Sequence, residues 1–238
     1  MTILGWVTAT LIVAVGAAVQ GSVGFGLGVI GAPILILIEP RLVPAPILLD
    51  AFLLTLLVTI REWKHVRVAD LGWSVPGRLL GTGLAVWVLK AVPETRLQFT
   101  MGLFMLLAVG MTMVGPRVRV GRRSLFGAGT LAGVMSTITS MGGPPMALLY
   151  QHEEGGRLRG TLAAFFSLGV VLSLGGLYLV GRFGWTEVRL AGQLLPGVLL
   201  GFALSAWTAS RLDKRQTRAV VLTTSALAGV VVVLKGLL

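Results

Sequence analysis

Two apolar stretches of this sequence are too long for a single membrane crossing, and small or helix-breaking residues interrupt both near the middle. Charged clusters divide the chain into eight apolar stretches, roughly 6–38, 43–60, 71–90, 97–114, 124–150, 161–180, 189–209 and 219–238. One crossing needs about 20 helical residues, and six of the stretches fit that length. As continuous helices, 6–38 and 124–150 would measure about 50 Å and 40 Å, against a hydrocarbon core of about 30 Å. Each is therefore predicted to be a hairpin of two short helices joined within the membrane, which enters and leaves on one side.

The composition supports a membrane protein without an extramembrane domain. Of the 238 residues, 55% are apolar and only 12% are charged, whereas about a quarter of the residues in soluble domains are charged. The net charge of +11 is attributed to basic residues that orient the helices in the bilayer, so we expect a lipid bilayer and no nucleic acid as partner. The absence of cysteine excludes disulfides, thiolate metal sites and cysteine nucleophiles.

Lysine and arginine are distributed unevenly among the connections between the stretches. Connections 61–70, 115–123 and 210–218 hold three, four and four of them, whereas connections 39–42, 90–96 and 181–188 hold one, two and one. The positive-inside rule places the first group in the cytoplasm and the second group outside. If 124–150 is a hairpin, connection 151–160 is also cytoplasmic, and both termini lie outside.

The two halves of the chain share short motifs in the same order. Gly31-Ala32-Pro33 matches Gly143-Pro144-Pro145, and Pro76-Gly77-x-x-x-Gly81 matches Pro196-Gly197-x-x-x-Gly201. We therefore expect an all-α polytopic membrane protein with an inverted-topology repeat. The first repeat is 1–118, with hairpin 6–38 and helices 43–60, 71–90 and 97–114; the second is 119–238, with hairpin 124–150 and helices 161–180, 189–209 and 219–238. Such repeats around broken helices are typical of secondary transporters, which bind substrate near the midplane at the repeat interface.

The motifs at the hairpins resemble a known transporter family. Gly24-Phe-Gly-Leu-Gly28 followed by Gly31-Ala-Pro33, with Met141-Gly-Gly-Pro-Pro145 in the second half, is similar to the paired glycine/proline signatures of the TauE/SafE sulfite exporter family. The resemblance covers nearly the whole chain. It implies a multi-pass protein of the bacterial inner (plasma) membrane that moves sulfite, an organosulfonate or a related sulfur anion, usually outward.

The hairpin apices are the predicted substrate-binding site. A helix that begins inside the membrane leaves backbone N–H groups free to bind an oxyanion, and glycine lets the anion approach the backbone. The candidate residues at the apices are Gln20, Ser22, Gly24, Phe25, Gly26, Ser136, Thr137, Thr139, Ser140, Gly142 and Gly143. Tight helix packing is the alternative interpretation of such glycines, and we favour it for the pairs Gly77/Gly81 and Gly197/Gly201.

Two ionisable residues, Asp50 and Arg78, are each eighth in an apolar stretch and are predicted to lie near the midplane. Charges at that depth face the protein interior, a partner or a water-filled path. One alternative is structural: the two form an ion pair that holds helices together, or Arg78 extends its side chain toward the cytoplasmic interface. In the other, Arg78 attracts the anion while Asp50 balances its charge or carries a proton. Gln193, the deepest polar residue of its helix, is a further candidate for coupling, or else makes a hydrogen bond in helix packing.

Other functional classes receive little support from the sequence. His65 and His152 are both in connections, and only one carboxylate lies deep, so a paired-acid or metal mechanism has no partners to use. We therefore expect no enzymatic activity, no cofactor and no metal. The expected partner is a small anionic substrate, a homo-oligomer is left open, and an anion channel or another small-solute transporter is the alternative function.

Overall fold

The computed structural model describes the whole chain except residues 115–117, 151–152, 154, 209–213 and 237–238. The described part contains ten α-helices and no strand. The helices are α1 (Ile3–Val23), α2 (Ala32–Ile38), α3 (Ala45–Arg61), α4 (Val68–Ala91), α5 (Leu97–Val114), α6 (Arg122–Thr139), α7 (Gly143–Leu149), α8 (Gly155–Leu179), α9 (Trp185–Thr208) and α10 (Lys214–Lys235). A π-helical turn, η1 (Leu27–Gly31), precedes α2.

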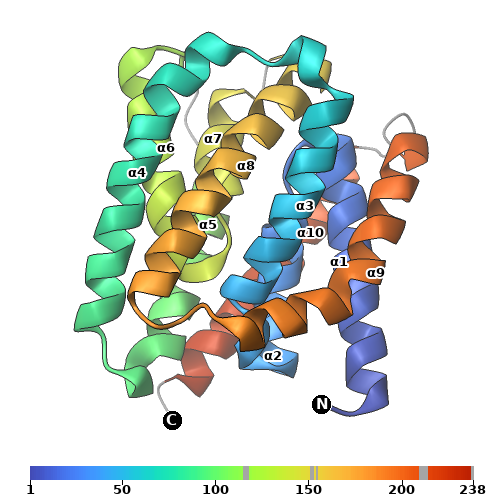
Figure 1. Cartoon of the computed structure of the whole chain (residues 1–238), viewed down its shortest axis with the longest axis vertical. Coiled ribbons are helices and arrows are strands. Elements are labelled where there is room, and N and C mark those ends of the chain that lie inside the picture. Colours follow the sequence, from blue (N-terminus) through green and yellow to red (C-terminus); the bar gives the residue numbers. More distant parts are fainter. Residues whose placement is uncertain (115–117, 151–152, 154, 209–213, 237–238) are drawn as a thin grey trace.

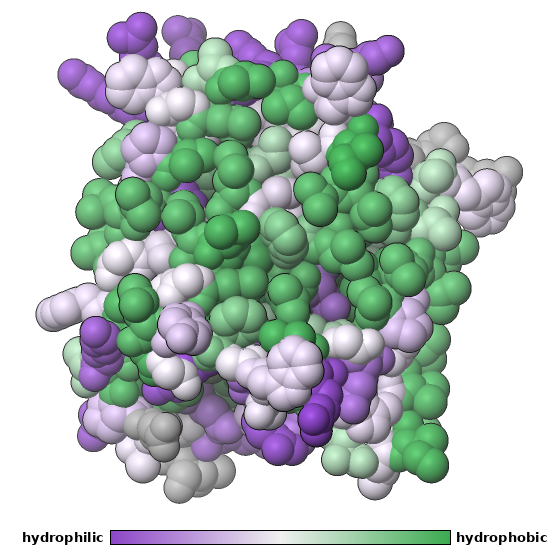
Figure 2. All heavy atoms as spheres, viewed as in Figure 1, coloured by the Kyte–Doolittle hydropathy of each residue, from purple (hydrophilic) through white to green (hydrophobic). Residues whose placement is uncertain are grey.

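The helices form a bundle suited to a bilayer. Among the described residues, four segments are long and apolar enough to cross a membrane: α1, Pro40–Arg61 with α3, α8 and most of α9. Figure 2 shows apolar side chains over the middle of one face and hydrophilic ones gathered mainly toward its two ends. In the spans that contain α3 and α8, half or more of the residues are buried within the protein, whereas the buried share is 28% in α1 and 33% in α9. The prediction of an all-α multi-pass membrane protein is therefore confirmed, and α3 and α8 form its centre.

The two long apolar stretches are broken as predicted, and each break returns the chain toward the end from which it came. The start of α1 and the end of α2 lie at the lower end of Figure 1, and the start of α6 and the end of α7 lie toward the upper end. The prediction of two short helices per hairpin was wrong in one respect: α1 has 21 residues and α6 has 18, and only α2 and α7, with seven each, are short. Nothing upstream of Gly24 or Ser140 interrupts the helical hydrogen bonds.

Helices also begin earlier than the apolar stretches predict. α8 begins at Gly155 rather than 161, and α4 begins at Val68 rather than 71. Charged residues at these ends continue the helix, because long side chains there can reach polar surroundings. The α3–α4 connection lies at the end of the bundle opposite the start of α1 and the end of α10. Parts of connections 115–123, 151–160 and 210–218 lie outside the described residues, and the cytoplasmic side stays a prediction.

Helices of the first half pack mainly against helices of the second. The largest contacts join α4 with α6, α1 with α9, α3 with α8 and α5 with α10. Glycines allow two of these pairings: a Cβ at Gly77 or Gly81 would collide with backbone of α6, and a Cβ at Gly197 or Gly201 would collide with backbone of α1. These glycines therefore serve helix packing, as we expected from their spacing. The exchange of partners fits an inverted repeat, which itself stays a prediction.

Candidate functional site

The first hairpin turns at two glycines. Gly24 ends α1 with φ of 102°, and its N–H donates to the Gln20 carbonyl oxygen; Gly26 follows with φ of 157°. Residues with side chains rarely adopt such a backbone. A Cβ at Gly26 would also lie 2.9 Å from the Val19 side chain. The chain can therefore reverse here only with glycine at these positions.

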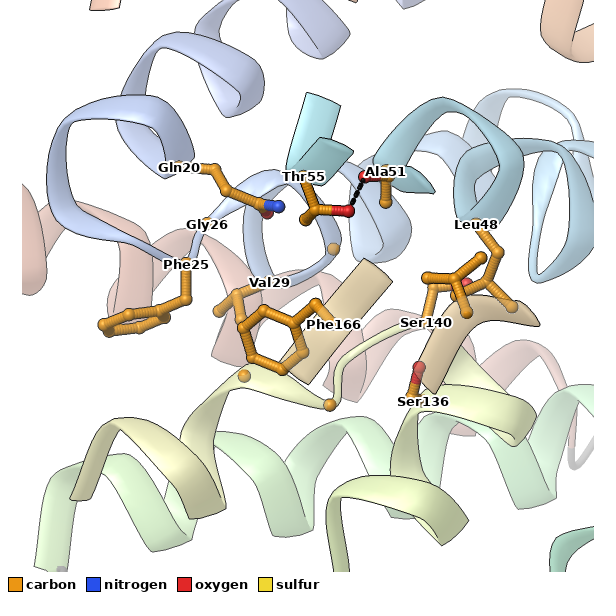
Figure 3. A pocket seen from close by; sticks show the side chains of 14 residues that line it. Gln20, Phe25, Gly26, Val29, Leu48, Ala51, Thr55, Ser136, Ser140 and Phe166 are labelled. Carbon is orange, nitrogen blue, oxygen red and sulfur yellow. Dashed lines mark hydrogen bonds between the residues drawn. The ribbon is translucent and has the colours of Figure 1, made fainter. Parts of the chain in front are cut away.

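Gln20 completes this turn with its side chain. Its Oε1 accepts from the Leu27 N–H at 2.9 Å, and because a backbone N–H only donates, the oxygen must face Leu27. The Gln20 amide nitrogen, which has two hydrogens to donate, is then left on the other side. Figure 3 shows this amide directed toward Thr55. Gln20 therefore presents a donor to the space between the hairpins.

The second hairpin turns at Ser140, which has φ of 65°. The Ser140 N–H donates to the Ser136 carbonyl oxygen, and its hydroxyl donates to the Pro44 carbonyl oxygen at 2.9 Å. Pro144 and Pro145 follow in the first turn of α7, and proline has no N–H. The start of α7 thus exposes fewer backbone donors than we predicted from the sequence, since of its first three residues only Gly143 carries an N–H.

The two apices meet. Gly28 lies so close to the Ser140 carbonyl group that a Cβ would collide with it, and a Cβ at Gly143 would lie 3.1 Å from Phe25 Cβ. A small pocket lies between the apices and is closed by the two central helices (Figure 3). Its lining comprises Gln20, Phe25, Gly26, Gly28 and Val29 of the first hairpin, Leu48, Ala51 and Thr55 of α3, Ser136, Ser140, Gly142 and Gly143 of the second hairpin, and Phe166 and Val170 of α8.

Arg78 lies directly behind the pocket wall. Its side chain is fully buried, and its Nη2 donates to Ser136 Oγ at 2.8 Å and to Ser173 Oγ at 3.1 Å. Its Nη1 donates to the Ala132 carbonyl oxygen at 2.9 Å, and the guanidinium carbon lies 5.6 Å from the centre of the Phe165 ring. Nε has no hydrogen-bond partner among the described residues. A positive charge is thus held one side chain away from the pocket.

Asp50 does not neutralise this charge. Asp50 is 2% exposed, and its Oδ2 has no hydrogen-bond partner in the described part of the chain. No ion pair between Asp50 and Arg78 occurs among the described residues, whose ion pairs all involve other groups. The geometry therefore gives no support to a structural Asp50–Arg78 ion pair.

The remaining candidates do not line the pocket. Ser22 donates to the Ala18 carbonyl oxygen, Thr139 donates to that of Met135, and the Thr137 hydroxyl shares a 2.8 Å hydrogen bond with Ser173. Gly24 packs against Arg159, and Gln193 is exposed on α9. Seven of the predicted residues line the pocket, namely Gln20, Phe25, Gly26, Ser136, Ser140, Gly142 and Gly143.

Sequence reasoning missed the part of the lining that comes from α3 and α8. Leu48, Phe166 and Val170 are apolar residues in apolar helices, and nothing in the sequence distinguishes them from residues of the core. Thr55 carried a signal, as a hydroxyl in the middle of stretch 43–60. Its Oγ1 donates to the Ala51 carbonyl oxygen at 2.8 Å, so its own proton is already engaged.

Comparison with known proteins agrees with the motifs at the hairpins. Residues 9–232 match the model of the family described as sulfite exporter TauE/SafE. No curated protein and no solved structure matches the chain. The family match spans both hairpins, the pocket between them and Arg78.

Proposed function

Because the chain belongs to the TauE/SafE sulfite exporter family, we propose that it is a secondary transporter for a small sulfur oxyanion, sulfite or an organosulfonate, which binds between the two hairpin apices. The observation that carries the proposal is the buried Arg78 guanidinium, hydrogen-bonded to a serine of the pocket wall and without a carboxylate partner among the described residues. A lone cation at the centre of a membrane helix costs about 2.5–3.5 kcal/mol. An anion in the pocket would offset that cost.

Two groups of the lining can donate hydrogen bonds to such an anion. The Ser136 hydroxyl accepts from Arg78 and, since a hydroxyl both accepts and donates, keeps a proton to give. Gln20 keeps its amide hydrogens because its oxygen is bound to Leu27. Thr55 and Ser140 use their own protons on backbone carbonyls. Selectivity for an oxyanion therefore rests on Gln20 and Ser136, with Arg78 supplying positive potential through Ser136.

Asp50 is the proposed group for proton coupling or charge balance. Its helix, α3, also contributes Leu48, Ala51 and Thr55 to the pocket. Its buried, unpartnered Oδ2 supports a neutral, protonated form, because an unpaired carboxylate is costly in an apolar medium. Loss of that proton would change the charge of the helix that forms one pocket wall.

The experiment is transport into liposomes by the purified full-length chain, with sulfite, sulfate, sulfoacetate and taurine as the panel. We expect saturable uptake of one or more sulfur anions by the wild type. Gln20→Glu keeps the bond to the Leu27 N–H but replaces the pocket donor with a second, anionic oxygen, and it should abolish uptake. Gln98→Glu, in the first turn of α5, is the matched control and should transport like the wild type.

Two results would contradict the proposal. If the wild type took up none of the four compounds, small sulfur oxyanions would be excluded as the substrate class. Equal uptake by Gln20→Glu and Gln98→Glu would remove the anion from this pocket. Unsaturable conductance of the same anions would instead favour the alternative function, an anion channel.

A further inference from the structure

A cluster of charged side chains lies outside the pocket, where the end of α3 meets the start of α8. Glu62 follows α3, and its Oε1 accepts from Arg159 Nε at 3.0 Å, with Arg159 Nη2 also at 3.0 Å. Arg61 Nε lies 3.5 Å from the same oxygen, and His65 Nδ1 lies 3.3 Å from the other oxygen, Oε2. Two arginines from two helices therefore share one carboxylate oxygen, and the cations outnumber the anion.

Arg61 also joins three helices. Its Nη1 donates to Ser205 Oγ of α9 at 2.9 Å, and its Nη2 donates to the Gly21 carbonyl oxygen of α1. Its guanidinium carbon lies 5.4 Å from the centre of the Phe202 ring. The side chains of Arg61 and Arg159 are 26% and 22% exposed, so both cations are reachable from the polar end of the bundle.

The cluster lies next to the pocket along each of these helices. Thr55 lines the pocket, and Arg61 follows it by six residues, about 9 Å of helix rise. Phe166 lines the pocket, and Arg159 precedes it by seven residues, about 10 Å. Within the first hairpin, Gly24 adjoins the pocket residue Phe25, and a Cβ at Gly24 would lie 3.3 Å from Arg159 Cα. Arg61 and Arg159 therefore lie one to two helical turns from the pocket, and both lie on the same side of it.

We propose that Arg61 and Arg159 form a second anion-binding site on this side of the pocket, for the same sulfur oxyanion, and that the Glu62 carboxylate occupies it in the substrate-free state. The inference rests on the proposed function. A guanidinium binds carboxylate and phosphate oxygens through its N–H donors. Arg159 directs Nε and Nη2 to the Glu62 oxygen, and Arg61 directs only its Nε to it. The Glu62 oxygen that both arginines face is thus in the place that a substrate oxygen would take. An arriving anion must displace Glu62, which loosens the link between α3 and α8 and admits the anion to the pocket.

The first test removes the competing charge. Glu62→Gln keeps the side-chain volume but no longer offers an anion to the arginines, so we expect the purified full-length protein to bind sulfite about tenfold more tightly in calorimetric titration. Glu39→Gln is the matched control. Glu39 also pairs with an arginine, Arg41 at 2.9 Å, but it follows α2 at the end of the bundle away from this cluster. The Glu39→Gln variant should therefore bind sulfite with the affinity of the wild type.

The second test removes one of the cations and serves also if Glu62→Gln fails to fold. Arg159→Gln should weaken sulfite binding at least tenfold. Arg157→Gln is its control on the same helix, since Arg157 pairs with Glu153 at 3.1 Å and is 46% exposed. This variant should bind sulfite like the wild type.

The outcomes separate this inference from the proposed function. If the wild type bound sulfite and both Glu62→Gln and Arg159→Gln bound it with the same affinity, the second site would be overturned. The proposed binding site in the pocket would not be affected. Weaker binding by folded Glu62→Gln would also overturn it, because Glu62 would then support the anion rather than compete with it. Absence of sulfite binding in both the wild type and Glu62→Gln would overturn the second site as a sulfite site. If none of the four panel compounds bound to either protein, both proposals would be overturned.

Discussion

Ser136 and Ser173 offer a direct test of how positive potential reaches the pocket. Both hydroxyls accept from Arg78 Nη2, at 2.8 and 3.1 Å, but only Ser136 lines the pocket. Replacing either serine with alanine removes one hydrogen bond from the same buried nitrogen. Both variants lose the bond to Arg78. Ser173→Ala loses the Thr137 bond in addition, and Ser136→Ala alone loses a donor to the anion.

The expected magnitudes follow from this difference. Losing a hydrogen bond to a buried charged group costs about 1–3 kcal/mol of stability, so both variants should melt at lower temperature than the wild type. A hydrogen bond to an anion contributes about 1.5–3 kcal/mol, which corresponds to about a 10- to 150-fold increase in Kd. Ser136→Ala should show this loss of sulfite affinity. Ser173→Ala should keep an affinity within about threefold of the wild type, because Ser136 still joins Arg78 to the pocket.

The assay combines sulfite titration with thermal unfolding of each purified variant in the same detergent. Equal losses of affinity in the two variants would mean that Arg78 acts only by holding α4 against its neighbours. Wild-type affinity in Ser136→Ala would mean that the anion does not bind this serine. In either case the proposed role of Ser136 would be wrong.

Two further predictions concern orientation and packing. Gly155→Cys, at the start of α8, should react with a membrane-impermeant thiol reagent only from the cytoplasmic side; labelling from outside alone would overturn the inverted-repeat prediction. Gly81→Ala should lower the melting temperature, since its Cβ would collide with the Thr130 carbonyl group, whereas Gly83→Ala on the same helix has free space and should match or exceed the wild type. A comparable loss in both variants would show that the packing argument is incorrect.

Much of the fold could be predicted because the bilayer limits the choices. Apolar stretches bounded by charged clusters correspond to α3, α5 and α9 within a few residues, since backbone in hydrocarbon must be helical or closed into a barrel. Gly24 and Gly26 located the first break because only glycine commonly takes the positive φ found there. Ser140, with positive φ as well, is a residue that the sequence alone does not distinguish from other polar residues near the second break.

The site was predictable only where polarity interrupts an apolar stretch. Gln20 and Ser136 could be found in this way, and Arg78 was noticeable as a charge at depth. The contributions of Leu48 and Phe166 could not be found, because the direction in which an apolar side chain points depends on which helices become neighbours. The cluster of Arg61, Glu62 and Arg159 was missed for a related reason. In the sequence these residues lie in two charged connections almost 100 positions apart, and only the pairing of α3 with α8 brings them together.

The exchange of helix partners between the halves determines the order in which the protein can assemble. α1 emerges first during synthesis, yet its main partner, α9, begins 182 residues after α1 does. Until then the positions of α1 that contact Gly197 and Gly201 lack their partner, and the positions of α4 around Gly77 and Gly81 lack theirs until α6 is inserted. Independent insertion of helices followed by their association in the lipid is therefore the route open to this chain. The pocket itself needs both halves, because its lining comes from α3 and the first hairpin as well as from α8 and the second hairpin.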